Sequence, residues 1–194
     1  TDLRLALPSK GRLAEDALAF LSAAGLRIDK PNPRQLQATL PALPGLTVLF
    51  QRAGDIAVSV RDGSVDFGIT GWDVVAERGG ADERLLRLEP ALGFGHCRLC
   101  VIVPESWSEV RCMADLAREE ARLGHRLRVA TKFPTLTTAF FAKHSRGEIA
   151  LVLPEGTLEV APAIGYADLI VDLVSSGTTM RDNRLRALED GEVL

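Results

Sequence analysis

The chain has 194 residues, of which 46% are hydrophobic, 25% charged and 5% aromatic, and its formal net charge is −3. These proportions are typical of a globular chain that is long enough for one large domain or two small ones. The negative charge and scarce aromatic residues argue against a nucleic-acid partner. No apolar run approaches the ~20 residues of a membrane span and no secretory signal is visible, so we expect a cytoplasmic protein without a membrane partner.

The first half of the chain alternates short apolar runs with amphipathic segments. Their periodicities predict strands over 3–7, 36–40, 46–50, 65–70 and 85–88, and helices over 13–24, 51–60 and 74–77. Lys10 and Arg12 lie in the turn after the first strand, which is typical of an anion site or of a solvated basic loop. Asp73 follows another strand, at the sheet edge where α/β proteins bind ligands, unless it only caps the next helix.

The second half of the chain alternates in the same way. Strands are predicted over 99–103, 127–131, 149–153 and 167–172, and helices over 110–123, 136–143, 159–166 and 180–188. The connector near 89–95 is rich in glycine and marks a predicted domain boundary. The last helix is too short to stand alone, so we expect it to return to the first lobe.

This alternation predicts an α/β fold with two lobes, like that of periplasmic binding proteins. One lobe would comprise residues 1–90 plus 181–194, and the other residues 91–180. Strand ends would face a cleft between the lobes, where we expect the active site.

The stretch from Asp172 to Met180 is the candidate ligand-binding loop. It follows a buried β-branched run, and four hydroxyl side chains surround its glycine: Ser175, Ser176, Gly177, Thr178 and Thr179. Backbone N–H groups and hydroxyls in a turn between a strand and a helix can hold a phosphate group. The local pattern alone leaves a second interpretation open, in which these side chains only cap the following helix.

Cys97 and Cys100 form a Cys-x-x-Cys motif. They belong to a predicted strand, where a spacing of three places side chains on opposite faces. No second pair of this kind could complete a zinc site. We therefore interpret both as buried thiols without a metal or redox role.

Several segments together resemble the ATP phosphoribosyltransferase family, the first enzyme of histidine biosynthesis. The signature that carries the resemblance comprises Glu159, Gly165-Tyr-Ala167, Asp172-Leu173 and Ser176-Gly-Thr-Thr-Met180. Further segments agree with the family in the same order: Leu7–Leu13, Asp66–Gly71 with Asp73, Gly93–Gly95 with Cys97–Leu99, and Ala130–Pro134. Family-like positions thus extend from the first predicted strand to the last loop.

The resemblance implies the reaction and the partners. The enzyme would transfer the phosphoribosyl group of phosphoribosyl pyrophosphate to N1 of ATP, giving phosphoribosyl-ATP and pyrophosphate. At this length the chain resembles the family's short form, which needs a regulatory subunit similar to histidyl-tRNA synthetase. A homodimer within a larger hetero-oligomer is the expected assembly. Mg²⁺ is the expected cofactor, held mainly by substrate oxygens rather than by protein ligands.

The resemblance also implies roles for individual residues. The carboxylates of Asp172 and Glu159 would meet the positive charge that develops on the ribose. Asp168 lies deeper on the same strand face than Asp172 and ranks lower. Phosphoribosyl pyrophosphate would be bound by Asp172, Ser175, Ser176, Gly177, Thr178, Thr179, Lys10 and Arg12. ATP would be bound by Arg52, Gly71, Asp73 and Lys132.

Other functions are compatible with the same fold. A solute-binding module, or an inactive subunit, would close on a phosphorylated ligand without chemistry. A different phosphoribosyltransferase would use another nucleophile. The motifs outside the loop count against this last alternative, and the signature around Asp172 counts against a binding module.

Overall fold

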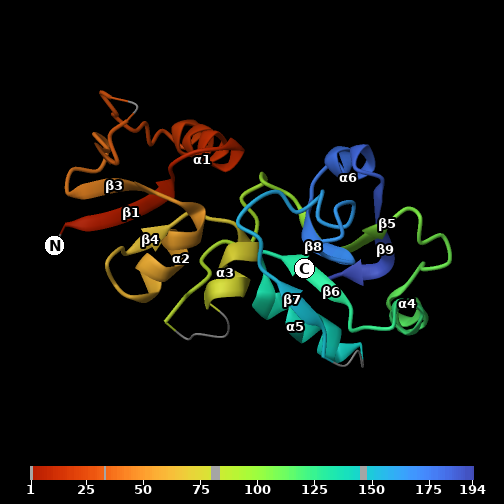
Figure 1. Ribbon diagram of the computed structural model, residues 1–194. Coiled ribbons are helices and arrows are strands. Elements are labelled where there is room, and N and C mark those ends of the chain that lie inside the picture. The colour runs from red at the N-terminus through yellow and green to blue at the C-terminus, as the bar shows by residue number, and fades with distance from the viewer. Residues whose placement is uncertain (1, 33, 80–83, 145–147) are drawn as a thin grey trace. The chain divides into compact units, whose positions relative to one another are not determined.

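The computed structural model describes residues 2–32, 34–79, 84–144 and 148–194 (Figure 1). The chain forms two compact units, residues 1–96 and residues 97–194. The boundary thus falls just after the predicted connector at 89–95. Within the described residues, no helix is both long enough and apolar enough to cross a membrane.

The first unit is built on a four-stranded sheet with the order β2-β3-β1-β4. Its strands are β1 (Leu3–Pro8), β2 (Gln37–Thr39), β3 (Leu46–Gln51) and β4 (Phe67–Gly68). Strands β3 and β4 flank β1 in parallel, and β2 is antiparallel to β3. The helices α1 (Arg12–Ala23), α2 (Ala53–Arg61) and α3 (Trp72–Gly79) follow β1, β3 and β4. The carboxyl ends of the three parallel strands therefore lie at one sheet edge, each followed by a helix.

Gly68 in β4 is where α2 approaches the first sheet most closely. A Cβ at this position would lie 2.4 Å from Cγ2 of Ile56 and 3.3 Å from Cγ2 of Val60. Ile56 is almost fully buried, so its side chain cannot move aside freely. Replacing Gly68 with alanine is therefore expected to lower the free energy of unfolding by about 1–3 kcal/mol through overpacking.

Urea unfolding would measure this effect, with Gly156→Ala as the matched control. A Cβ on Gly156 would meet nothing within 4 Å. Equal stability of the two alanine variants would contradict the overpacking argument.

The second unit is built on a five-stranded sheet with the order β7-β6-β8-β5-β9. Its strands are β5 (Arg98–Pro104), β6 (Arg128–Thr131), β7 (Ala150–Val152), β8 (Leu169–Val174) and β9 (Leu185–Glu192). Strands β7, β6 and β8 are parallel, whereas β5 is antiparallel to both β8 and β9. The helical segments are η1 (Met113–Asp115), α4 (Leu116–Leu123), α5 (Pro134–Lys143) and α6 (Thr178–Asp182).

Side chains pack on both faces of the second sheet, which explains its long apolar strands. One face includes Val101, Val129 and Val171 and is covered by side chains such as Leu116 and Phe141. The opposite face includes residues such as Ile102 and Ile170, and it is covered by turns from the 158–167 segment and by Met180 of α6.

The prediction that residues 181–194 return to the first lobe is wrong. Helix α6 ends at Asp182, and β9 then pairs antiparallel with β5 in the second sheet. Leu185 and Leu188 are three residues apart, which suits a helix face. In the structure these two leucines are buried on opposite faces of the sheet, as an odd spacing on a strand dictates.

Three other elements differ from the predictions. Residues 85–88 form no strand, and Leu86 and Leu88 are largely exposed. Residues 159–166 form consecutive turns instead of a helix. The helical segment predicted from Val110 begins only at Met113. Cys100 is buried as expected, but Cys97 is exposed, so the interpretation of both as buried thiols holds for Cys100 alone.

Candidate functional site

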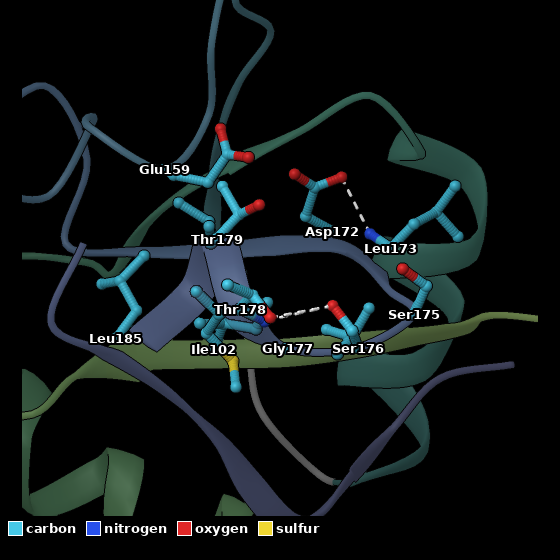
Figure 2. A pocket seen from close by; sticks show the side chains of 13 residues that line it. Ile102, Glu159, Asp172, Leu173, Ser175, Ser176, Gly177, Thr178, Thr179 and Leu185 are labelled. Atoms are coloured by element: carbon cyan, nitrogen blue, oxygen red, sulfur yellow. Dashed lines mark hydrogen bonds between the residues drawn. The ribbon is translucent and has the colours of Figure 1, made fainter. Parts of the chain in front are cut away.

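A pocket lies at the carboxyl end of β8 in the second unit, and Figure 2 shows its lining side chains. Asp172, the 175–179 loop and the first residues of α6 form one wall. Glu159 contributes from the turn segment before β8, and β5 and the start of β9 add the apolar side chains of Ile102 and Leu185. The sequence did not predict these two apolar residues as part of the site, because they come from strands far apart in the chain.

Asp172 is a half-buried carboxylate near the end of β8, opposite Cys100 of β5. Its Oδ1 accepts a hydrogen bond of 2.8 Å from the backbone N–H of Leu173. Burial raises the pKa of Asp172, and the neighbouring charge of Glu159 raises it further. The Leu173 N–H and the charge of Lys132 act in the opposite direction. The site thus holds a partly desolvated carboxylate. Such a group can stabilise a nearby positive charge strongly.

The 175–179 loop presents four exposed hydroxyl side chains. It turns at Gly177, whose φ of 73° is in the left-handed region that favours glycine. The hydroxyls of Ser176 and Thr178 lie 3.1 Å apart, and the backbone N–H of Thr178 reaches Ser176 Oγ at 3.4 Å. The loop therefore offers hydroxyl groups on its exposed side, which can donate to an oxyanion ligand.

Glu159 and Lys132 reach the same region of the second unit. Leu158 and Ala161 are buried on either side of Glu159 and anchor its turn segment. Lys132 follows β6, whose Thr131 is paired with Val171 of β8, so it lies at the sheet edge that carries Asp172.

The turn after Lys132 is held by a buried hydroxyl. Thr131 Oγ1 accepts a 2.9 Å hydrogen bond from the N–H of Phe133, and it lies 3.2 Å from Thr137 Oγ1 on α5. Both threonines are fully buried. Lys132, predicted to bind ATP, lies in the second unit, where its charge lowers the pKa of Asp172.

The remaining predicted residues gather at the carboxyl edge of the first sheet. They are Lys10 and Arg12 after β1, Arg52 after β3, and Gly71 and Asp73 after β4. Hydrogen bonds join these loops: the N–H of Ser9 donates to the carbonyl of Gln51 at 2.7 Å, and the hydroxyl of Thr70 donates to the carbonyl of Ala53 at 3.0 Å.

The carboxylate of Asp73 turns back over Gly71. A Cβ on Gly71 would lie 2.1 Å from Oδ1 of Asp73, so a side chain here would displace this carboxylate. Burial raises the pKa of Asp73, while backbone N–H groups of Val74 and of Asp73 itself lower it. Beside it, the exposed ring of Trp72 is covered by the guanidinium of Arg87, 4.4 Å from the ring centroid.

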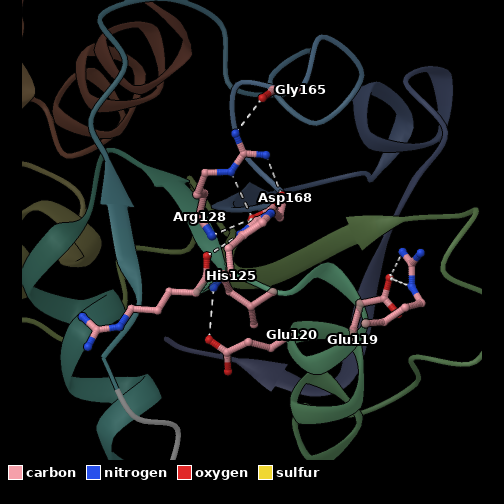
Figure 3. A network of polar contacts seen from close by, with 9 residues as sticks. Glu119, Glu120, His125, Arg128, Gly165 and Asp168 are labelled. Atoms are coloured by element: carbon pink, nitrogen blue, oxygen red, sulfur yellow. Dashed lines mark hydrogen bonds and ion pairs between the residues drawn. The ribbon is translucent and has the colours of Figure 1, made fainter.

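Asp168, the lower-ranked carboxylate, belongs to an ion pair at the amino end of β8 (Figure 3). Its Oδ1 is 2.7 Å from Nη2 of Arg128, and its Oδ2 accepts the backbone N–H of Arg128 at 2.8 Å. Arg128 also donates to the carbonyl of Gly165 at 2.9 Å. These bonds fix the start of β8 against β6, which is a structural role.

The structure thus sorts the predicted residues into two groups. Those in the second unit are Asp172, Glu159, Lys132 and the loop Ser175–Thr179; those in the first unit are Lys10, Arg12, Arg52, Gly71 and Asp73. Within the described part of the chain, no cluster of three or more His, Cys, Asp or Glu side chains could hold a metal ion.

Two solved structures are similar in fold to this chain. The ATP phosphoribosyl transferase (HisG:HisZ) complex from Thermotoga maritima matches with a TM-score of 0.73 at 24% identity, covering 98% of this chain and 82% of that chain. The arginine-, lysine-, histidine-binding protein ArtJ from Geobacillus stearothermophilus matches with a TM-score of 0.52 at 14% identity, covering 98% and 76%. They confirm the predicted fold class, an α/β fold with two lobes like those of periplasmic binding proteins.

Sequence comparison identifies the family. The model of the ATP phosphoribosyltransferase family matches residues 52–194. The ATP phosphoribosyltransferase of Brucella anthropi is 46% identical over 196 residues, which cover 98% of this chain and 85% of the relative. The chain therefore belongs to the ATP phosphoribosyltransferase family, pentosyltransferases that catalyse the first step of histidine biosynthesis.

Proposed function

We propose that the pocket at the end of β8 is where this chain binds phosphoribosyl pyrophosphate for transfer to N1 of ATP. The observation that carries the proposal is the half-buried carboxylate of Asp172 beside a loop of exposed hydroxyls in one pocket. The loop 175–179 would hold the 5′-phosphate through its N–H and O–H donors. Asp172 and Glu159 would then lie near the ribose.

The carboxylates of Asp172 and Glu159 suit the chemistry of phosphoribosyl transfer. N1 of ATP forms a bond to the anomeric carbon while the bond from that carbon to pyrophosphate breaks, and the ribose gains oxocarbenium character. This step requires positioning of the two substrates more than proton transfer. A carboxylate with little solvation stabilises the positive charge on the ribose strongly. We therefore assign that role to Asp172, with Glu159 as the second carboxylate.

Residues of the first unit supply the complementary contacts in this proposal. Lys10 and Arg12 would contact the pyrophosphate, because both are cationic and follow β1 at the sheet edge. Arg52, Gly71 and Asp73 would contact ATP. Lys132 lies beside Asp172, so we assign it to the phosphoribosyl substrate as well. Mg²⁺ would bind chiefly to the substrate's pyrophosphate oxygens, as is usual for this ion.

The proposed active form contains a regulatory subunit similar to histidyl-tRNA synthetase. The resemblance to the family's short form supports this partner, and the Thermotoga maritima protein of like fold is described as a HisG:HisZ complex. We also propose that the chain forms a homodimer within a larger hetero-oligomer and that this assembly is located in the cytoplasm.

Purified chain mixed with ATP, phosphoribosyl pyrophosphate and Mg²⁺ is expected to form the N1-ribosylated nucleotide, detected by its absorbance. Product should require both substrates, and its rate should rise when the synthetase-like subunit is added. Omitting Mg²⁺ should stop the reaction. Binding of phosphoribosyl pyrophosphate without product, with and without the partner, would instead indicate a binding module or an inactive subunit.

A further inference from the structure

The pocket at the end of β8 is poor in positive charge. Its lining residues, all within the described chain, include the carboxylates Glu159 and Asp172 but no lysine or arginine. A phosphate group beside two carboxylates is repelled unless a cation lies near it. Lys132, which follows the neighbouring strand β6, acts on Asp172, so the loop itself needs a second source of positive charge.

Arg181 lies on α6 and turns its side chain back over this loop. Its Nη2 is 3.4 Å from the carbonyl oxygen of Ser176 and 3.5 Å from Oγ1 of Thr178. A Cβ on Gly177 would lie 3.0 Å from its Nη1. The guanidinium therefore lies against the three central residues of the loop. The signal in the sequence is the spacing of three from Thr178, which brings two side chains together on a helical turn.

The present contacts of Arg181 leave much of its binding capacity unused. Distances of 3.4 and 3.5 Å exceed the 2.7–3.2 Å of good N–H···O bonds. A guanidinium has five N–H donors, and these two bonds reach a carbonyl and a hydroxyl rather than a carboxylate. The side chain is also exposed. A phosphate on the loop would offer shorter, charge-assisted and bidentate bonds.

We propose that Arg181 is a further binding residue, which donates two N–H groups to the phosphate held by the loop 175–179. The proposal rests on the function proposed above, because that phosphate is the 5′-phosphate of phosphoribosyl pyrophosphate. On binding, the guanidinium exchanges its weak bonds to Ser176 and Thr178 for bonds to phosphate oxygens. Its positive charge offsets the repulsion from Glu159 and Asp172.

The test measures the affinity of the full chain for phosphoribosyl pyrophosphate with Mg²⁺ by calorimetry. Arg181→Gln is expected to raise Kd by about 10- to 100-fold, the usual loss for a hydrogen bond to a charged group. Arg181→Lys should recover part of the affinity, since lysine keeps the charge but not the planar pair of donors. The matched control is Arg184→Gln, which removes the same charge from an exposed residue three positions on.

Two further measurements separate ligand contact from a purely structural role. Inorganic phosphate should compete with phosphoribosyl pyrophosphate less well in Arg181→Gln by a similar factor, whereas ATP affinity and the unfolding midpoint should stay unchanged. Wild-type affinity in Arg181→Gln, or an equal loss in Arg184→Gln, would overturn the proposal. A wild-type chain that binds neither phosphoribosyl pyrophosphate nor phosphate would overturn the proposed function itself, and this inference with it.

Discussion

Replacing Asp172 with asparagine is expected to lower kcat by about 100- to 1,000-fold, the usual effect of removing a preorganised charge from an active site. Asparagine keeps the shape of the side chain and can still accept the hydrogen bond from the Leu173 N–H. The negative charge alone is lost, so the fold should be unchanged. Steady-state kinetics with both substrates would measure the effect. The matched control is Asp182→Asn, which removes one carboxylate from the exposed surface of α6.

The same substitution is expected to stabilise the protein. Burial raises the pKa of Asp172 above its usual 3.8, so in the folded state its ionised form is the unfavourable one. The cost of ionisation is absent below pH 3.8 and grows as pH rises through the raised pKa. The unfolding free energy of the asparagine variant should therefore exceed that of the wild type increasingly from pH 4 upward, while wild-type activity rises over the same range.

Loss of turnover with a gain in stability would identify Asp172 as a residue retained for chemistry. Wild-type turnover in the asparagine variant would rule out the assigned role. A variant that is both inactive and less stable would indicate instead that Asp172 holds the fold together.

Removing Arg128 is expected to destabilise the second unit more than neutralising its partner Asp168. In Arg128→Ala the Asp168 carboxylate, whose side chain is 5% exposed, loses both of its guanidinium bonds. The carboxylate keeps the backbone N–H of residue 128 and lies 3.7 Å from His125, so the loss should be about 3 kcal/mol, the lower end of the range for a broken buried pair. In Asp168→Asn the guanidinium can turn to water, so the cost should be about 1–2 kcal/mol.

The pH dependence gives this prediction a second readout. Burial acts to raise the pKa of Asp168, but the hydrogen bonds and charge of Arg128 outweigh it and hold the pKa below 3.8. The pair therefore stabilises the fold above pH 3.8 and loses this effect as pH falls through the depressed pKa. Urea unfolding should show that the penalty for Arg128→Ala, constant between pH 7 and pH 4, shrinks as the pH is lowered from 4 toward 2. Equal penalties for the two variants, or a penalty that does not vary with pH, would contradict the argument.

Local pattern was sufficient to predict most strands and the position of the candidate loop. The β-branched run before Asp172 favoured a buried strand, which places the residues after it at a sheet edge. The same rule placed Asp73 at a sheet edge, and the structure brings Lys10 and Arg52 to that edge because the parallel strands before them end there.

Pairing between distant segments could not be predicted in the same way. Residues 185–192 are a strand only because β5, far back in the chain, accepts them, and leucines at a spacing of three fit either structure. The position of Lys132 depends on which strand lies beside β6. The contacts of Arg181 depend on a backbone turn at Gly177 that is invisible in hydrophobic periodicity.

The strand order of the second sheet has a consequence for how the protein is made. Strand β5 leaves the ribosome before the other four strands of its sheet, yet its two neighbours, β8 and β9, are the last two strands to emerge. The first sheet, in contrast, has all its strands once Gly68 has been synthesised. We therefore expect the first unit to fold during translation. Over the same period both edges of β5 remain unpaired, because β8 and β9 have not yet been synthesised. This interval is when the nascent chain is most exposed to aggregation and most dependent on chaperones.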